Sequence, residues 1–105
     1  MANKKVDNPK RCRFKARKLA VKYKYGLEWD EYTSLHEKAN GCCEICGKEL
    51  SLLVDKDKET AYVDHDHITN KVRGILCRIC NVALGHFRDS KLHLLKAIEY
   101  LDKQT

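Results

Sequence analysis

The chain has 105 residues, a length typical of one small domain, and it carries a formal net charge of +6. The first residues, MANKKVDNPKR, lead into no apolar segment, and no apolar run is long enough to span a membrane. These features argue against a secreted or a membrane protein. The chain has six cysteines, and in a reducing compartment paired cysteines are expected to bind metal rather than to form disulfides; a metal would stabilise so small a core.

The positive charge lies in the first 25 residues, which hold ten Lys or Arg against one Asp, a balance of +9. The remaining residues hold eleven against fourteen acidic side chains, a balance of −3. Such a basic segment is typical of a nucleic-acid contact, although a solvated, solubilising surface would carry the same charges. The candidate DNA contacts in this segment are Arg11, Arg13, Lys15, Arg17, Lys18 and Lys22.

Two helices are predicted before the first cysteine pair. Residues 9–25 suit a helix that has proline at its start and that Gly26 ends. Its partial apolar face is expected to consist of Phe14, Leu19 and Tyr23. A second helix is predicted over residues 28–39, where apolar side chains recur at helical spacing. We interpret residues 1–41 as a basic N-terminal helical arm, and residues 42–105 as the core with a C-terminal helix, within one compact domain.

A β-hairpin is predicted near the middle of the chain. The strings YVDHDH and KVRGILC are candidate strands, and the short segment Ile68, Thr69 and Asn70 joins them. Residues 51–61 suit a loop with a weak strand.

Two further helices are predicted after the hairpin. The first begins near Arg78 or Cys80 and runs to about His86, and Asp89 with Ser90 offers an N-cap for the second. The last helix has an apolar stripe that is expected to be core or the seam of a dimer: Leu92, Leu95, Ile98 and Leu101. The predicted fold class is therefore α+β, mostly helical around a small central hairpin.

Four of the cysteines form two Cys-x2-Cys pairs, Cys43 with Cys46 and Cys77 with Cys80. Each pair sits at a predicted turn, and four thiolates at about 2.3 Å from one ion make a closed, structural zinc site. Four buried thiols, or disulfides, are the alternatives. Cys42 is also four residues before Cys46, but the Cys-x2-Cys spacing favours Cys43 as the ligand.

The stretch AYVDHDH places Asp64 and His65 inside the segment whose ends the zinc would hold together. Asn81 directly follows the last predicted zinc ligand, at the start of a helix. Asp64 and His65 are therefore expected to face Asn81 across a small gap. Arg73, just after the hairpin turn, is expected either to reach a phosphate or to pair with a hairpin carboxylate.

The strings CEICGKEL, YVDHDHITNKVRGILCRICNVALG and AIEYL resemble the phage recombination endonuclease VII family of the HNH, or His-Me finger, superfamily. The resemblance covers roughly residues 14–101 and implies a zinc-stabilised ββα-metal finger. It implies that Asp64 and Asn81 hold a catalytic Mg²⁺ or Mn²⁺ and that His65 is the general base. It also implies that His67 lies near the scissile phosphate or supports the site. Some members have an acidic residue at the position of Leu84, so this chain offers one ligand fewer.

The function that the resemblance implies is hydrolysis of DNA phosphodiester bonds, by nicking or double-strand cleavage, with 5′-phosphate and 3′-hydroxyl products. The expected place of action is the cytoplasm of a phage-infected bacterial host. Cleavage of both strands with one site per chain would favour a homodimer, and phage replication or packaging proteins are candidate partners. The alternative is a non-catalytic zinc module that binds DNA or protein, which needs the four cysteines but not Asp64, His65 and Asn81 together.

Overall fold

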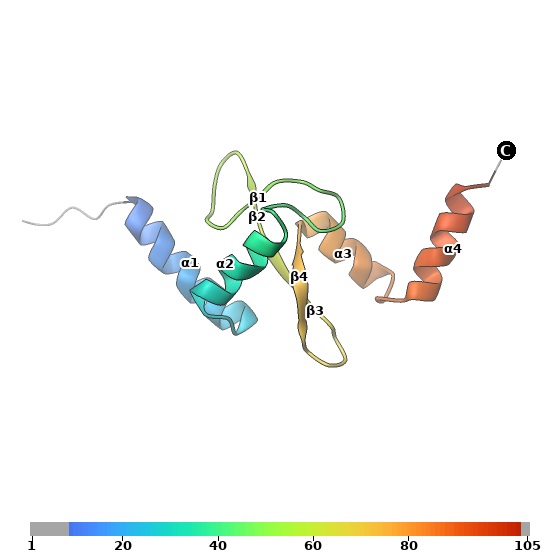
Figure 1. Cartoon of the computed structure of the whole chain (residues 1–105), viewed down its shortest axis with the longest axis horizontal. Coiled ribbons are helices and arrows are strands. Elements are labelled where there is room, and N and C mark those ends of the chain that lie inside the picture. The colour runs from blue at the N-terminus through green and yellow to red at the C-terminus, as the bar shows by residue number, and fades with distance from the viewer. Residues whose placement is uncertain (1–8, 104–105) are drawn as a thin grey trace, which may run out of the picture.

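The computed structural model describes residues 9–103, in which the chain forms four helices and four short strands. The predicted fold class, α+β, is confirmed. The elements are α1 (Pro9–Tyr25), α2 (Trp29–Lys38), β1 (Leu50–Ser51), β2 (Glu59–Thr60), β3 (Tyr62–His65), β4 (Val72–Leu76), α3 (Arg78–His86) and α4 (Lys91–Leu101). Figure 1 shows α1 and α2 on one side of the β3–β4 hairpin and α3 on the other, with α4 beyond α3.

The two N-terminal helices pack against each other through aromatic side chains. Phe14 of α1 meets Trp29 of α2 edge to face at 5.1 Å between ring centroids, and Tyr25 stacks on Tyr32 at 6.5 Å. Val21, one turn before Tyr25, is fully buried. The helix face that packs therefore follows the spacing 14, 17, 21 and 25.

This face corrects the predicted apolar face of the first helix. Leu19 and Tyr23 are 56% and 85% exposed, whereas Phe14 alone of the predicted three takes part in the packing. Residues 14, 19 and 23 do not share one face of a helix, because a helical face recurs every three or four residues. Val21 was the missed core residue, and its spacing from Phe14 was the available signal.

The β3–β4 hairpin is antiparallel, with Val63 opposite Ile75 and Asp64 opposite Gly74. A bulge between Asp64 and His65 interrupts the register, so that His65 pairs with Val72. Bulges re-aim side chains that would otherwise alternate strictly between the two faces of a strand. The irregularity thus falls at the two adjacent residues that the sequence marks as candidate site residues.

The core is small and gathers where α1, α2, the hairpin and the cysteine segment meet. Its buried members are Val21, Tyr32, Cys43, Leu50, Ala61, Val63, Ile75, Leu76 and Cys77. The short strands β1 and β2 pair in parallel and close the loop at residues 50–60. The core therefore surrounds the cysteines and the inner part of the hairpin, and it leaves the hairpin's turn and α4 outside.

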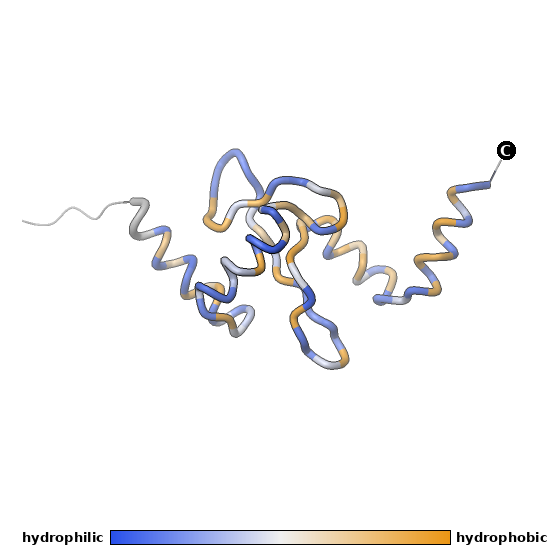
Figure 2. The backbone as a smooth tube through the Cα atoms, viewed as in Figure 1, coloured by the Kyte–Doolittle hydropathy of each residue, from blue (hydrophilic) through white to orange (hydrophobic). Residues whose placement is uncertain are grey.

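Helix α4 begins at the predicted N-cap, where the Ser90 hydroxyl accepts a hydrogen bond from the backbone N–H of His93 at 3.1 Å. Its apolar stripe is not core in this chain, because Leu92, Leu95, Ile98 and Leu101 are all more than half exposed. Figure 2 shows hydrophobic and hydrophilic positions mixed along this helix, which projects from the rest of the molecule. Among the helices of residues 9–103, none has the length and apolar character needed to cross a membrane.

Candidate metal centre and active site

The four predicted zinc ligands lie together. The sulfur atoms of Cys43, Cys46, Cys77 and Cys80 are all within 4.8 Å of one another, and those of Cys46 and Cys77 are 3.7 Å apart. Tetrahedral coordination at a Zn–S distance of about 2.3 Å separates the sulfurs by about 3.8 Å. A disulfide would need about 2.05 Å. The arrangement is that of a structural site for a metal ion such as zinc.

Cys43, and not Cys42, belongs to the cluster, as the Cys-x2-Cys spacing predicted. Cys43 is buried and belongs to the cluster, whereas the Cys42 thiol points to the carbonyl oxygen of Asn40 at 3.4 Å. Of these two adjacent residues, only Cys43 contributes a sulfur atom to the cluster.

Each cysteine pair sits at a turn whose backbone N–H groups face sulfur. The N–H groups of Ile45 and Cys46 donate to the Cys43 sulfur at 3.4 and 3.5 Å. In the second pair, Cys77 caps α3, and its sulfur accepts from the N–H of Cys80 at 3.4 Å. These donors stabilise negative charge on sulfur, and they fix both pairs for binding one ion.

The electrostatics of the cluster favour a cation. Burial opposes ionisation of Cys43, but the backbone donors outweigh it and lower its pKa to about 6. Burial and the neighbouring sulfurs raise the pKa of Cys80 to about 12. One thiolate therefore forms readily and the next is resisted by its neighbours, a conflict that a bound dication resolves.

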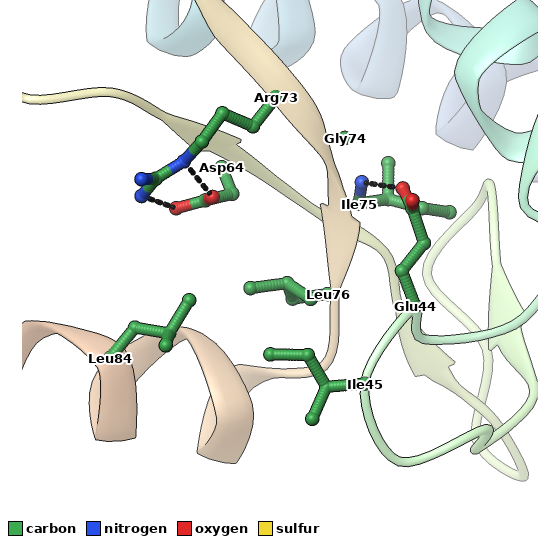
Figure 3. A pocket seen from close by; sticks show the side chains of 8 residues that line it. All are labelled: Glu44, Ile45, Asp64, Arg73, Gly74, Ile75, Leu76 and Leu84. Atoms are coloured by element: carbon green, nitrogen blue, oxygen red, sulfur yellow. Dashed lines mark hydrogen bonds and ion pairs between the residues drawn. The ribbon is translucent and has the colours of Figure 1, made fainter. Parts of the chain in front are cut away.

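Glu44 joins the metal centre to strand β4. Its backbone N–H donates to the carbonyl oxygen of Ile75 at 3.3 Å, and its carboxylate accepts from the N–H of Ile75 at 2.9 Å. A Cβ on Gly74 would lie 2.0 Å from a carboxylate oxygen of Glu44, so only glycine fits beside this contact. Figure 3 shows Glu44 reaching β4 next to Gly74. The metal centre thereby fixes the strand that lies opposite Asp64.

Asp64 is buried, with 7% of its surface exposed, and it forms an ion pair with Arg73. The guanidinium donates to both carboxylate oxygens, Nε at 2.7 Å and Nη2 at 3.1 Å (Figure 3). Asp64 raises the pKa of Arg73 further above its usual range. Of the two roles predicted for Arg73, the structure shows the pairing with a hairpin carboxylate, which neutralises a buried negative charge.

A hollow of about 230 Å³ lies between the hairpin and α3, and Asp64, Arg73 and Leu84 are among its lining residues. Helix α3 packs against β3, the strand that carries Asp64, and Leu84 is its residue in the hollow. Asn81, the fourth residue of α3, is half-buried and does not line the hollow. The hollow thus joins Asp64 to Leu84, and it is not the expected gap between Asp64, His65 and Asn81.

His65 and His67 lie apart from this hollow. The imidazole of His65 packs against Tyr25, with 6.1 Å between ring centroids and a 43° tilt. His67 Nδ1 lies 3.4 Å from a carboxylate oxygen of Asp89, which also accepts from Arg73 at 3.3 Å. Asp89 therefore connects Arg73, the partner of Asp64, to His67. The sequence did not predict this role for Asp89, whose only signal was its position next to Ser90, the N-cap of α4.

The basic residues of α1 differ in how they are placed. Lys15, Lys18 and Lys22 are exposed, and the side chain of Arg11 lies outside the described residues. Arg17 is turned inward, donating to the carbonyl oxygen of Leu52 at 3.0 Å and to the hydroxyl of Tyr32 at 2.7 Å. Arg13 donates to the carbonyl oxygen of Val54 at 3.4 Å. DNA contact by these residues stays a prediction, and Arg17 has in addition an internal packing role.

Comparison with known proteins identifies a family for this chain. Residues 18–103 match the model of the recombination endonuclease VII family. The chain belongs to the recombination endonuclease VII family. This confirms the resemblance that the motifs around the hairpin predicted.

Two similar proteins come from phages. The chain is 42% identical to the Gene 59 protein of Mycobacterium phage L5 over 78 residues, which are 73% of this chain and 44% of that protein. It is 40% identical to the Gene 59 protein of Mycobacterium phage D29 over 80 residues, 75% of this chain and 46% of that protein. The chain therefore spans less than half the length of these relatives.

Proposed function

We propose that this protein is a metal-dependent DNA endonuclease of the HNH type. The observation that carries the proposal is the position of Asp64. It is a buried carboxylate at a strand bulge, beside a hollow that α3 also lines, in a chain of the endonuclease VII family. A purely structural zinc module has no need of a buried carboxylate on this side of the hairpin.

The two residues expected to hold the catalytic metal, Asp64 at the hollow and Asn81 outside its lining, carry oxygen ligands that suit a hard divalent cation. Asp64 supplies carboxylate oxygens, and Asn81, on the first turns of α3, supplies an amide oxygen; Mg²⁺ usually takes only one or two protein ligands of this kind. The carboxylate already holds a cationic partner, Arg73, which indicates that positive charge is stable there. When bound, Mg²⁺ or Mn²⁺ would supply Lewis-acid stabilisation of charge on the phosphate.

The remaining chemistry belongs to the side chains. A neutral His65 imidazole would accept a proton from a water molecule whose oxygen attacks phosphorus in line. The bond from phosphorus to the 3′ oxygen breaks, and that oxygen takes a proton from solvent, which leaves 5′-phosphate and 3′-hydroxyl ends. His67, which pairs with Asp89, would lie near the phosphate or support the site.

The basic face of α1 would contact the phosphate backbone. Such contacts give an affinity that depends strongly on salt and little on base sequence. We therefore expect weak sequence preference, and a homodimer wherever both strands of a duplex are cut. Action in the cytoplasm of an infected host, with phage replication or packaging proteins as partners, completes the proposal.

Two observations favour a second candidate, a non-catalytic zinc module that binds DNA or protein. His65 packs on Tyr25 rather than beside the hollow, and Asp64 is already satisfied by Arg73. A module that keeps these residues only for packing would show the same contacts.

The test is incubation of the zinc-loaded protein with supercoiled plasmid, with Mg²⁺, with Mn²⁺ and with no added divalent metal. His65→Ala is the test variant and Cys42→Ser, outside the metal cluster, is the matched control. The proposal expects open-circular product that needs the added metal, persists in Cys42→Ser and is lost in His65→Ala. Linear product at early times would indicate a dimer or paired nicking. Folded protein that binds DNA and cuts neither plasmid nor branched DNA would leave the binding module as the function.

A further inference from the structure

A second hollow, of about 310 Å³, lies between the turn end of the hairpin and the junction of α3 with α4. Arg73 lines both this hollow and the one beside Asp64, so a single side chain separates the two. Three cationic side chains line the second hollow: Arg73, Arg88 and Lys91. His67 lies at the same place.

The two carboxylates that line this hollow are occupied by the protein itself. Asp66 accepts the backbone N–H groups of Ile68 and Thr69, at 2.8 and 3.0 Å, within the hairpin turn. Asp89 lies 3.3 Å from Arg73 and 3.4 Å from His67. Neither is directed to the remaining cations of the hollow.

Arg88 and Lys91 have no acidic partner within the described side chains. The ion pairs found there involve other residues, and none joins Arg88 or Lys91 to a carboxylate within 4.0 Å. Two cations of one hollow are therefore free to bind an anion from outside.

The two cations differ in their local setting. Arg88 has φ +55° and the following Asp89 has φ +54°, and their N–H groups donate to the carbonyl oxygens of Gly85 and Leu84, which closes the end of α3. Lys91 is the first residue of α4, where the positive end of the helix dipole disfavours a cation. The backbone turn at Arg88 and Asp89 thus brings Arg88 and Lys91 to the same hollow, where both lack an acidic partner and an anion would offset their charge.

We propose that this hollow binds a backbone phosphate of DNA, the neighbour of the phosphate at the Asp64 side, through Arg88 and Lys91. This proposal rests on the proposed function, because the phosphate at the Asp64 side and the phosphate in the second hollow would belong to one DNA strand that passes over Arg73. A phosphodiester fits because its charge and oxygen atoms suit a guanidinium and an ammonium group. The α3–α4 junction thereby adds a DNA contact on the opposite side of the site from α1.

The test measures binding of a short DNA duplex by fluorescence anisotropy over a range of salt concentrations, with no added divalent metal. All proteins carry His65→Ala so that the DNA stays intact. The test variant is Arg88→Asn with Lys91→Gln, because asparagine tolerates the left-handed conformation. The matched control, Lys38→Gln with Lys56→Gln, removes the same charge at exposed positions outside the hollow.

Each lost phosphate contact should lower affinity about fivefold at 0.15 M salt and reduce the slope of log K against log salt by about 0.9. We expect both losses in the test variant and much smaller ones in the control. Thermal unfolding of each variant shows that the comparison is between folded proteins. Equal losses in test and control variants would overturn the proposal.

The outcome is separable from that of the proposed nuclease. If the wild-type protein cuts no DNA but the test variant loses binding, the hollow is kept as a phosphate site and the nuclease is rejected. Cleavage by wild-type protein, with the affinity and salt slope of the Arg88 and Lys91 variant unchanged, would keep the nuclease and reject the hollow. A protein that binds no DNA at all would reject both.

Discussion

Tyr25, at the end of α1, lies against the imidazole of His65, with 6.1 Å between the two ring centroids. The same tyrosine stacks on Tyr32, which is fully buried and donates a hydrogen bond from its hydroxyl to the carbonyl oxygen of Ala61 at 2.8 Å. A continuous chain of rings therefore runs from the core to the candidate general base. The position of His65 depends on a residue forty positions earlier in the sequence.

The first prediction concerns Tyr25 as a positioning residue. Tyr25→Ala removes the ring that packs on His65, and a displacement of about 1 Å at a catalytic group costs roughly a hundredfold in rate. We expect kcat for plasmid nicking to fall about tenfold to a hundredfold, with KM little changed, and Tyr25→Phe to keep most of the activity.

The pH profile of kcat separates this role from loss of fold. A displaced base should change the profile of Tyr25→Ala relative to wild type, whereas a smaller folded fraction would scale it uniformly. A Tyr25→Phe enzyme as impaired as Tyr25→Ala would show that the hydroxyl, not the ring contact, is what matters.

The second prediction concerns the cysteine cluster. Cys80→Ala removes one of four sulfurs, and because metal binding supplies folding free energy in small domains, we expect loss of bound zinc and of the cooperative unfolding transition. Cys42→Ser should retain one zinc per chain and unfold like wild type, since its thiol lies outside the metal cluster and donates to the Asn40 carbonyl oxygen. Metal analysis with thermal unfolding measures both. Full zinc content in Cys80→Ala would argue against this ligand set.

The third prediction compares two glycines. Gly74→Ala would place a methyl group 2.0 Å from a carboxylate oxygen of Glu44, which must move and give up its hydrogen bond to Ile75. We expect a loss of about 1–3 kcal/mol in the free energy of unfolding. Gly85→Ala, within α3 and with no atom inside 4 Å of the new methyl, should stabilise by about 0.4–1 kcal/mol.

Denaturant unfolding of Gly74→Ala, Gly85→Ala, Glu44→Ala and the double variant Glu44→Ala/Gly74→Ala measures these changes in the free energy of unfolding. In the double variant the added methyl no longer meets a carboxylate, so the cost of Gly74→Ala should be smaller than in the wild-type background. An unchanged cost would place the strain in the backbone of β4 instead of in the contact with Glu44.

Local signals in the sequence were sufficient for the elements and for the metal ligands. Pro9 and Gly26 bound the first helix, and the spacing of Cys43, Cys46, Cys77 and Cys80 specified one cluster. These features depend on neighbours in the chain or on a fixed ligand geometry. A sequence pattern therefore carries them directly.

Side-chain partners across the fold were beyond the reach of sequence spacing. Asp89 pairs with Arg73 and His67 because the α3–α4 junction turns back toward the hairpin, and no periodicity predicts that turn. The spacing of Val21 from Phe14 made it a candidate for the packed face of α1, but spacing alone does not decide whether that face or the face with Leu19 packs against α2 and β3. Both cases depend on how the helices and strands pack in three dimensions, which their local sequences do not determine.

The last prediction separates the two roles open to Arg17. Its Nε and Nη2 groups donate to the carbonyl oxygen of Leu52, to the hydroxyl of Tyr32 and, at 3.3 Å, to the carbonyl oxygen of Ala61. Arg17→Gln removes these donors beside a buried tyrosine, so we expect a loss of about 1–3 kcal/mol in the free energy of unfolding. Lys15→Gln, at an exposed position of the same helix, should change stability by less than about 0.5 kcal/mol.

DNA binding should rank the same two variants in the opposite order. Lys15→Gln should weaken affinity for a duplex and reduce the salt slope by up to about 0.9, because an exposed lysine is free to meet a phosphate. Arg17→Gln, compared at a temperature where it is fully folded, should leave the slope almost unchanged, because its guanidinium is already committed to oxygen atoms of the protein. A slope reduced by Arg17→Gln as much as by Lys15→Gln would show that Arg17 leaves these partners to bind DNA. The basic face of α1 would then be formed by DNA binding rather than present beforehand.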